Sequence, residues 1–532
     1  TWWVTTAPCR ATWTRRYCLV RSSACCAAPM KCCAWPEDAP GTSSIWATAF
    51  SRAPIWSTYR PWPNLSTKEA VFDVAVVGGG AAGLAAAYEL HQRGASFVLL
   101  EAAPRLGGVI RTEQVDGFTL DAGPDSLLVQ KPAALELCRE LGLGERLVPT
   151  LEPRTGYILR NRLLPIPGAS VLGIPTAIAP WVGTALLSPA AKLRMAAEWL
   201  IPRGDATQES VGDFFRRRFG REMVEYVAEP MLAGIHAGDV DRLSIQSLFP
   251  RLVEAERTHG SVIRALRSAR AKTDRPSAGP FRSLPGGIEE LVTALVATLP
   301  SAAIRRGSRA LDLSGPSPFA VRVGEGPAVS ARAVILATPA HATADLVRGL
   351  DDRLAALCAQ IAYTSTATVL LSYPQSSVRR PLPGTGFLVP RTQRGVPLTA
   401  GSVVSSKWPG RAPEGQVLLR GFLGGARDPE VLSRPDDELI DRTHKAFAGL
   451  LNIACRPDLT RVYRWERVMA QHNVGHIDRV AAIEDRLGRV PGLFVTGAGF
   501  RGVGIPDCVA DARATARAVV EWQRERRTPT TP

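Results

Sequence analysis

The sequence predicts an α/β fold, a mix of helices and strands built around a discontinuous Rossmann-like domain. A βαβ pattern at residues 71–101 and a second strand with a glycine turn at 492–504 predict this domain. Short apolar runs broken by Gly and Pro over 360–425 predict an antiparallel sheet in a second, substrate-binding domain. With 532 residues, 45% of them hydrophobic, the chain is long enough for two or three globular domains.

The βαβ pattern is the most specific local signal. An apolar run at 71–77 ends in the glycine turn GGGAAG at 78–83, and an alanine-rich helical segment follows and stops at Gly94. A second apolar run then ends in Glu101. This order of strand, glycine turn, helix, strand and acid is typical of domains that bind an adenine dinucleotide.

The positions of this turn have separate physical roles. Gly78 permits the tight turn, Gly80 lets the backbone approach a pyrophosphate, and Gly83 lets the helix pack closely on the strand. The first N–H groups and the positive dipole end of the helix favour phosphate, and the acid can accept hydrogen bonds from ribose hydroxyls. We therefore predict a dinucleotide site formed by Gly78, Gly80, Ala81, Ala82, Gly83 and Glu101.

A second pair of glycines follows the acid at once, in the segment RLGG at 105–108. Gly107 and Gly108 let the chain pass close to a ligand, and Arg105 can neutralise a phosphate. The segment resembles the extended fingerprint of FAD-binding, amine-oxidase-like flavoproteins rather than that of simple NAD dehydrogenases. FAD is therefore the predicted cofactor, one molecule per chain.

The chain is basic, with a formal net charge of +15. Such a charge is compatible with nucleic acid, an anionic membrane surface or an acidic substrate as a partner. The sequence has no Lys/Arg-rich run with interleaved aromatics and no zinc-finger spacing, so we predict no nucleic-acid partner. An arginine-rich, solvated surface is the simplest alternative.

Residues 1–70 differ from the rest of the chain. They hold six of the ten Cys and seven of the twelve Trp, without helical or strand periodicity. They also lack the apolar core of a signal peptide. The cysteine pairs at 25–26 and 32–33 lack the spacing of zinc ligands, so we predict no metal site. We interpret this segment as an atypical extension, disordered or artefactual.

Residues 163–191 contain no charged residue, but prolines interrupt them repeatedly. Because proline removes a backbone donor and breaks a helix, a simple transmembrane helix is not expected. Two interpretations stay open. The segment either dips into one membrane leaflet, with Lys192, Arg194 and Arg203 near the headgroups, or forms an apolar wall of a substrate cavity.

Residues 211–229 have helical spacing and are expected to be helical. The pattern places four arginines on its exposed positions, where they would face water or a membrane: Arg216, Arg217, Arg218 and Arg221.

The motifs divide the chain into parts. Residues 71–150, 281–345 and 470–525 are predicted to form the FAD-binding domain. Residues 151–280 form a helical part that contacts substrate or membrane, and residues 346–469 form the substrate-domain sheet. A ligand is expected where the two domains meet.

Together these motifs resemble the protoporphyrinogen/coproporphyrinogen oxidase family, over about residues 71–522. The match rests on residues 77–80 and 101–108, on GPDS at 123–126, on PGG at 285–287, and above all on RGVGIPDC at 501–508. The resemblance implies a non-covalent FAD and a cytoplasmic enzyme of haem biosynthesis. It also implies the six-electron oxidation of a porphyrinogen by O2, with release of three H2O2.

The family's roles carry over by position. The flavin is expected to do the chemistry, so no catalytic side chain is assigned. Lys131 looks like the lysine that Bacillus-type members place near the substrate propionates, although a solvated lysine is an equal alternative. This lysine slightly favours coproporphyrinogen III, with four propionates, over protoporphyrinogen IX, with two. The resemblance adds these residues near the cofactor: Ala102, Val109, Gly123, Pro124, Asp125, Ser126, Ala310, Trp465, Val503, Gly504 and Ile505.

The chain departs from the family at one point. Members often carry Pro-Gln-Tyr before Gly-His, whereas this chain has Ala470, Gln471 and His472 before Gly475 and His476. A histidine at this position could face the substrate, but a structural role is expected.

Two other classes of protein remain possible. One is another flavoenzyme on this fold, an amine oxidase or a carotenoid desaturase. The other is a non-catalytic binding protein, like a prenyl-GTPase dissociation inhibitor. Haem-pathway enzymes, a second copy of the chain and the inner face of the membrane, as a peripheral contact, are possible partners.

Overall fold

The computed structural model describes residues 71–168, 170–177, 179–271, 278–324 and 326–527. The contacts divide the chain into two units, Thr1–Ser57 and Thr58–Pro532, and every described residue belongs to the second unit. The expected extension at 1–70, with its cysteine pairs, lies outside the described residues.

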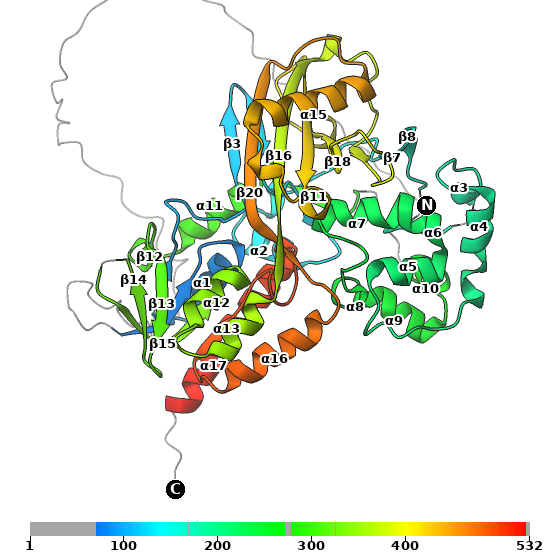
Figure 1. The fold of residues 1–532 in the computed structure, drawn as a ribbon. Helices are drawn as coiled ribbons and strands as arrows, with labels where there is room; N and C mark the ends of the chain where they lie inside the picture. Colours follow the sequence, from blue (N-terminus) through cyan, green and yellow to red (C-terminus); the bar gives the residue numbers. More distant parts are fainter. Residues whose placement is uncertain (1–70, 169, 178, 272–277, 325, 528–532) are drawn as a thin grey trace, which may run out of the picture. The chain divides into compact units, whose positions relative to one another are not determined.

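A seven-stranded sheet contains the strands of the predicted βαβ unit (Figure 1). Its strands run in the order β12-β2-β1-β15-β14-β13, and β21 also pairs with β15. The pairs β1–β2, β1–β15, β2–β12 and β15–β21 are parallel, whereas β13 and β14 pair antiparallel. The strands are β1 (Phe72–Val77), β2 (Phe97–Leu100), β12 (Ile304–Arg305), β13 (Ala310–Ser314), β14 (Phe319–Val323), β15 (Val329–Leu336) and β21 (Leu493–Val495).

Helices cover both faces of this sheet, which explains why β1 is buried along its whole length and, apart from Asp73, apolar. On one face, α1 and α17 pack against each other and share a core with α2 and α11. On the other face, α12, α13 and α16 share a second core with the sheet. These helices are α1 (Ala81–Gln92), α2 (Ala133–Glu140), α11 (Glu289–Thr298), α12 (Ala340–Val347), α13 (Asp352–Ala359), α16 (His476–Gly488) and α17 (Ile505–Arg527).

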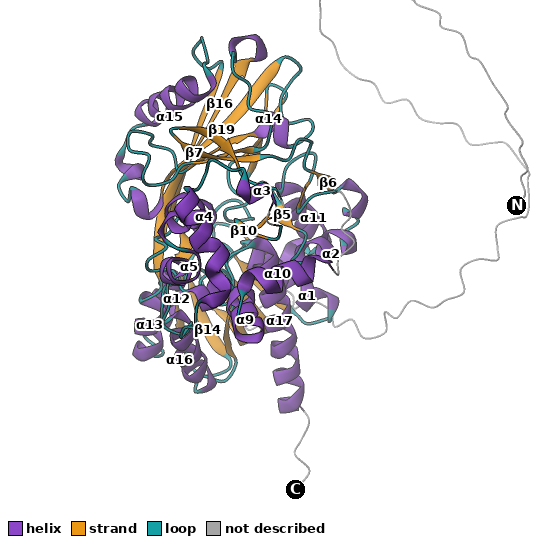
Figure 2. Ribbon diagram, turned by 90° about the vertical axis from the view of Figure 1, so that its right-hand side faces the viewer, coloured by secondary structure: helices purple, strands orange, loops and turns teal. Residues whose placement is uncertain are grey.

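A second seven-stranded sheet runs in the order β20-β16-β19-β18-β17-β7-β8. Its pairs are antiparallel except for β17 with β7, so the antiparallel prediction for 360–425 is confirmed. Helix α15 (Asp436–Leu451) packs against it (Figure 2). The strands are β7 (Gly156–Arg160), β8 (Arg162–Pro165), β16 (Ala362–Pro374), β17 (Gly386–Leu388), β18 (Ala400–Val403), β19 (Gln416–Gly424) and β20 (Leu459–Gln471).

Short elements connect the two sheets. Strand β11 (Phe281–Ser283) pairs with β5 (Leu127–Leu128) and β6 (Val148–Pro149), and β3 (Thr112–Val115) pairs with β4 (Phe118–Asp121). The other short elements are β9 (Ser170–Val171), β10 (Ile174–Pro175), α14 (Val404–Lys407) and the 3-10 turns η1 (Gly144–Arg146), η4 (Ser301–Ala303), η5 (Gln375–Ser377), η6 (Gly425–Arg427) and η7 (Val431–Ser433).

The remaining helices form a separate helical part with its own core. Residues of the uncharged segment 163–191, including Trp181 and Leu186, are buried in that core. Among the residues that the structure describes, no helix is both long and apolar enough to cross a bilayer. The elements are α3 (Ala179–Val182), α4 (Pro189–Ala196), η2 (Ala197–Leu200), α5 (Val211–Phe219), α6 (Arg221–Met223), η3 (Val224–Ala228), α7 (Glu229–His236), α8 (Ile245–Leu248), α9 (Pro250–His259) and α10 (Val262–Ala271).

Residues 211–229 are helical as predicted except at Gly220, but the prediction that Arg218 is exposed is wrong. The helix is interrupted at Gly220, which has φ +93, so α5 ends there and a new helical stretch begins. Arg218 is fully buried rather than exposed. Its guanidinium lies 2.7 Å from the carboxylate of Glu198 and 3.3 Å from that of Glu256, and a buried charge of this kind requires such partners.

Candidate functional site

The two glycine turns of the first βαβ unit contact each other through their backbones. The N–H of Gly107 donates to the carbonyl of Gly79 at 2.8 Å, and Gly80 forms a β-bridge with Gly107. A Cβ atom on Gly108 would lie 3.2 Å from the Cα of Gly80. The turns therefore form one side-chain-free surface at the carboxyl ends of the parallel strands.

The start of α1 is shaped to receive an anion. Gly80 is its N-cap residue and provides no side-chain cap, so the first N–H groups of the helix, including those of Ala81 and Ala82, are free for a ligand. Gly78 has φ +107. A Cβ atom on Gly83 would lie 1.7 Å from the carbonyl oxygen of Gly78, so only glycine fits there.

The carboxylate of Glu101 braces this turn. It accepts from the N–H of Gly79 at 2.6 Å and from the N–H of Ala103 at 2.7 Å. Ala102, which lies between Glu101 and Ala103 in the chain, is exposed. The carbonyl of Glu101 accepts from the N–H of Ser308 at 2.7 Å, which brings the start of β13, at Ala310, to the same end of the sheet. The predicted contacts with the ribose and the adenine stay predictions.

The guanidinium of Arg105 is occupied by its own turn. It donates to the carbonyls of Leu106 and Ile110 at 3.0 Å, and also to that of Gly108. Burial lowers the pKa of Arg105. A phosphate would therefore share this guanidinium with the backbone. The immediate role of Arg105 is to hold its own turn, at residues 105–108.

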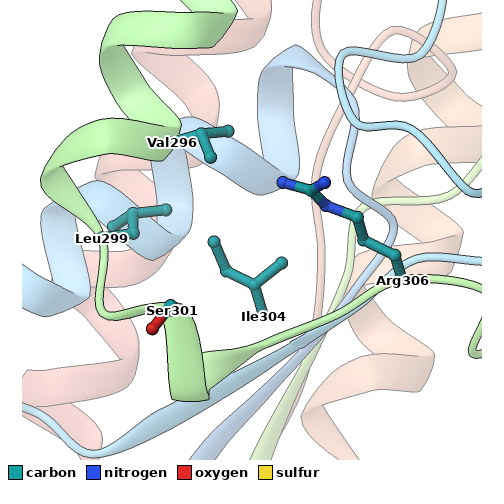
Figure 3. Close-up of a pocket in the computed structure, with 5 residues that line it drawn as sticks. All are labelled: Val296, Leu299, Ser301, Ile304 and Arg306. Atoms are coloured by element: carbon teal, nitrogen blue, oxygen red, sulfur yellow. The ribbon is translucent and has the colours of Figure 1, made fainter. Parts of the chain in front are cut away.

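A small cavity lies near the same end of the sheet (Figure 3). It has a volume of about 350 Å3, and Arg306 lies across it from Leu299, the residue that follows α11. Gly307 and Ser308, which follow Arg306, donate to the carbonyls of Ala103 and Glu101. Its remaining lining residues are Val296, Ser301 and Ile304.

Gly123 lies between the segment that follows the first βαβ unit and strand β20 of the second seven-stranded sheet. A Cβ atom on Gly123 would lie 1.8 Å from the carbonyl oxygen of Val109 and 3.7 Å from Trp465 of β20. The indole N–H of Trp465 donates to the carbonyl of Ala122 at 3.1 Å. The structure thus brings together Val109, Gly123 and Trp465, which are far apart in sequence, and the side chain of Val109 is partly exposed beside them.

Asp125 does not present a free carboxylate to a ligand. It accepts from the ammonium of Lys407 at 2.8 Å and from the indole N–H of Trp408 at 3.2 Å. The hydroxyl of Ser126 donates to it at 2.9 Å. Burial by itself would raise the pKa of Asp125, but Lys407 and Arg420 outweigh burial and hold it well below its usual range. Pro124 and Ser126 are half-buried on either side of this anchor.

Two buried arginines extend this network. Arg420 of β19 donates to the carbonyls of Ala122 and Gly123, and Arg411 lies 3.1 Å from the carboxylate of Asp121. Burial lowers the pKa of Arg420 and raises that of Asp121. Sequence reasoning missed these residues and Lys407. An arginine inside the apolar run 417–422 was the one signal available for Arg420.

The glycine turn between β21 and α17, at residues 497–504, completes the site. A Cβ atom on Gly497 would lie 3.7 Å from the Cβ of Ala82. The turn before α17 therefore lies beside the start of α1. Val503 and Ile505 are partly buried at the start of α17, and Gly504 is exposed there. The carboxylate of Asp507 accepts from the N–H of Gly504 at 3.3 Å and forms an ion pair of 2.6 Å with Lys131.

These residues fit a dinucleotide. Helices α1 and α17 pack against each other, Gly497 before α17 lies beside Ala82 at the start of α1, and a Cβ atom on Gly80 would have no protein atom closer than 4.0 Å. The glycine surface is thus open on the side where a pyrophosphate would lie. Within the described ranges, no cluster of three metal-ligating side chains is found. Fold and site define a dinucleotide-binding protein with a Rossmann-like sheet.

Comparison with known proteins agrees with this class. The family model of flavin containing amine oxidoreductases matches residues 81–520. Coproporphyrinogen III oxidase of Bacillus subtilis is 36% identical, over 83% of this chain and 96% of that protein. Protoporphyrinogen oxidase 1 of spinach chloroplasts is 30% identical, over 85% of this chain and 84% of that protein.

A solved structure gives the same answer. A protein of Exiguobacterium sp. 255-15 that carries a provisional protoporphyrinogen oxidase name is 32% identical, with a TM-score of 0.75 over 84% of this chain and 98% of that one. The chain therefore belongs to the flavin containing amine oxidoreductases and, within them, to the protoporphyrinogen/coproporphyrinogen oxidase family.

Proposed function

We propose that this chain is a porphyrinogen oxidase of haem biosynthesis that uses one non-covalently bound FAD and O2. Family membership supports the reaction class. The observation that carries the assignment to this site is the contact of Gly123 with Val109 on the cofactor side and Trp465 on the substrate sheet. A ring bound at this junction lies within reach of both domains.

The chain's own residues would hold and orient the two ligands. The free N–H groups at the start of α1 would bind the pyrophosphate, and Glu101, while bracing the turn, keeps acceptor capacity for the ribose. Val503, Gly504 and Ile505, at the positive end of the α17 dipole, would support the flavin ring. When bound, the flavin would take a hydride from the macrocycle, which also loses an N–H proton, and O2 would reoxidise the flavin to give H2O2, so that three such cycles convert a porphyrinogen to a porphyrin with three H2O2.

The cofactor is proposed to be non-covalent. Cys508 is the cysteine beside the flavin-end turn, and its thiol is buried and donates to the carbonyl of Gly502 at 3.6 Å. Burial raises the pKa of Cys508 to about 12, so a nucleophilic thiolate is not available there.

Coproporphyrinogen III is the proposed substrate, with protoporphyrinogen IX as the alternative. Lys131 is the reason for this order, because its side chain is exposed to 47% and its ammonium can bind a propionate as a compact charge. Coproporphyrinogen III carries more carboxylates than protoporphyrinogen IX. A contact between a substrate carboxylate and Lys131 would therefore be more frequent and more specific with coproporphyrinogen III.

The test is a fluorescence assay of the FAD-loaded protein under O2. Coproporphyrinogen III, protoporphyrinogen IX and a panel of amines are supplied separately, and porphyrin and H2O2 are measured. We expect porphyrin fluorescence to rise with three H2O2 per porphyrin, and faster with coproporphyrinogen III. Turnover of amines alone would favour an amine oxidase, and a colourless protein that takes up no FAD would favour a non-catalytic binder.

We also propose a peripheral membrane contact. It uses one exposed residue of segment 163–191, Val182, and three exposed residues that follow this segment. The exposed apolar side chains lie in α3, α4 and η2, and basic groups accompany them, with the guanidinium of Arg264 lying 5.3 Å from the ring centre of Trp199. Apolar side chains beside cations suit an anionic lipid surface on the cytoplasmic side. We call Val182, Leu193, Trp199 and Leu200 the 182–200 patch.

A further inference from the structure

Two buried histidines stack on each other beside the glycine turn at residues 497–504. His472 follows the end of β20, and His476 is the first residue of α16. Their ring centres are 3.8 Å apart, with 12° between the ring planes. The two residues are exposed to only 1% and 2%. The pair is therefore a packed unit and not a solvated surface feature.

Each ring donates to a carbonyl of the same turn. The Nε2 of His472 lies 2.9 Å from the carbonyl oxygen of Ala498, and the Nε2 of His476 lies 3.0 Å from that of Phe500. Because a carbonyl oxygen can only accept, both Nε2 atoms must carry the proton. The hydroxyl of Ser247 then donates to the free Nδ1 of His472, at 3.1 Å. The tautomers are thus set by the surroundings.

Burial keeps the pair neutral. It lowers the pKa of His472 to about 4 and that of His476 to about 3. Protonation of both rings would bring two positive charges into a stack. The two donors therefore persist unchanged over the physiological pH range.

The same residues join the turn to the helical part. The N–H of Ser244 donates to the carbonyl of His472 at 2.8 Å, and Ser247 belongs to α8. The side-chain amide of Gln471 donates to the carbonyl of His236, the last residue of α7, at 2.9 Å. A displacement of these helices would therefore reach the glycine turn through His472.

We propose that His472 and His476 are positioning residues that hold the turn at 498–504 for the flavin end of the cofactor and couple it to the helical part of the substrate side. The proposal rests on the proposed function only for the identity of the ligand. The donors act through the backbone of Ala498 and Phe500, seven and five residues before the start of α17, and not by touching the reacting atoms.

The experiment separates the donor from the ring. His472→Gln and His476→Gln keep an N–H near the Nε2 position, whereas His472→Phe and His476→Phe keep a flat ring and remove the donor. His444→Phe is the matched control, because His444 also packs on an aromatic ring, that of Tyr373, in the other sheet. The dissociation constant for FAD, the visible circular dichroism of the bound flavin and the KM-against-kcat split are measured on each holoenzyme.

We expect the two Phe variants to bind FAD about tenfold or more weakly, with a changed flavin dichroism, because a buried carbonyl loses its donor. The Gln variants and His444→Phe are expected to stay within about twofold of the wild type. Phe variants with wild-type affinity and dichroism would refute the proposal, and equal loss in the Gln and Phe variants would show that packing, and not donation, matters.

A second measurement does not need the cofactor. Amide hydrogen exchange of residues 497–504 should be faster in the Phe variants than in the Gln variants, with no change in the second sheet. If the wild type takes up no FAD, the proposed function fails, and this exchange pattern still decides whether the histidines hold the turn. Unchanged exchange in all four variants would overturn the inference by itself.

Discussion

The ammonium of Lys131 and the carboxylate of Asp507 form an ion pair of 2.6 Å, although the two residues are 376 positions apart. Asp507 lies in the first turn of α17, where it also accepts from the N–H of Gly504. The cation that we propose for substrate binding is thus held at the helix end that we propose for the flavin. A substrate carboxylate at Lys131 would lie beside the reacting ring.

Replacing this lysine should weaken substrate binding more than turnover. In Lys131→Met we expect the KM for coproporphyrinogen III to rise about tenfold with a smaller change in kcat, because one charge-assisted contact is lost. Steady-state kinetics with both porphyrinogens check this. Lys445→Met is the matched control, since Lys445 pairs with Asp441 on the outer helix α15. An unchanged KM would mean that Lys131 serves only Asp507.

The open side of the first glycine turn predicts a clean separation of folding from binding. In Gly80→Ala the new methyl has no protein atom closer than 4.0 Å, so stability should stay within about 0.5 kcal/mol of the wild type. FAD affinity should fall about a hundredfold, because the methyl occupies the pyrophosphate side. Flavin titration and urea unfolding measure the two effects.

The control for this variant is Gly449→Ala, in helix α15, where a Cβ atom also meets nothing within 4 Å. It should leave FAD binding unchanged. Gly80→Ala with full FAD affinity would place the pyrophosphate elsewhere.

The buried pair Asp125–Lys407 should matter for stability. Side-chain exposures are 12% and 17%, so removing one partner leaves a largely buried charge without compensation. We expect Lys407→Met to lower the free energy of unfolding by about 3 kcal/mol, and Asp125→Asn by a similar amount. The double variant should recover part of the loss. Urea unfolding of the singles and the double gives the coupling, and additive losses would contradict it.

Three buried histidines predict how stability depends on pH. Burial lowers the pKa of His236 and His472 to about 4 and that of His476 to about 3, against about 6.5 in the unfolded chain. The unfolded state therefore binds more protons between these values, and stability falls as the pH drops from about 6.5 toward 4. Each histidine contributes up to about 1.4 kcal/mol per pH unit.

Unfolding free energies at pH 7, 6 and 5 test this, with His472→Gln expected to show a smaller slope than the wild type. Carboxylates with lowered pKa values do not interfere, since they lose their contribution only near pH 4 and below. A stability that is flat between pH 7 and 5 would show that these rings become protonated without cost.

The 182–200 patch predicts binding to anionic vesicles. The double variant Leu193→Ser and Leu200→Ser should lose most of its flotation with phosphatidylglycerol vesicles, because these side chains are exposed to 73% and 62%. Neutral vesicles should bind the wild type weakly. Leu311→Ser, an exposed leucine in β13, is the control. Equal binding of all variants would exclude the patch as the contact.

Local patterns predicted much of the fold. The βαβ pattern at 71–101 occurs as β1, α1 and β2, and the strand before the glycine turn within 492–504 occurs as β21. Each depends on hydrophobic periodicity within a few residues and on turn residues at its ends. The helical prediction for 211–229 missed the break at Gly220, which has a positive φ, and Arg218 is buried because acids from two other elements surround it.

The candidate site divides in the same way. Sequence by itself determined the glycine turn at 78–83 and its acid, because their geometry depends on neighbours in one βαβ unit. Only the tertiary structure decided what Asp125, Lys131 and His472 do, since their partners Lys407, Asp507 and Ala498 come from other elements. No spacing encodes such pairs, because it is the packing of the two sheets and the helical part that brings their charges and donors within hydrogen-bond distance.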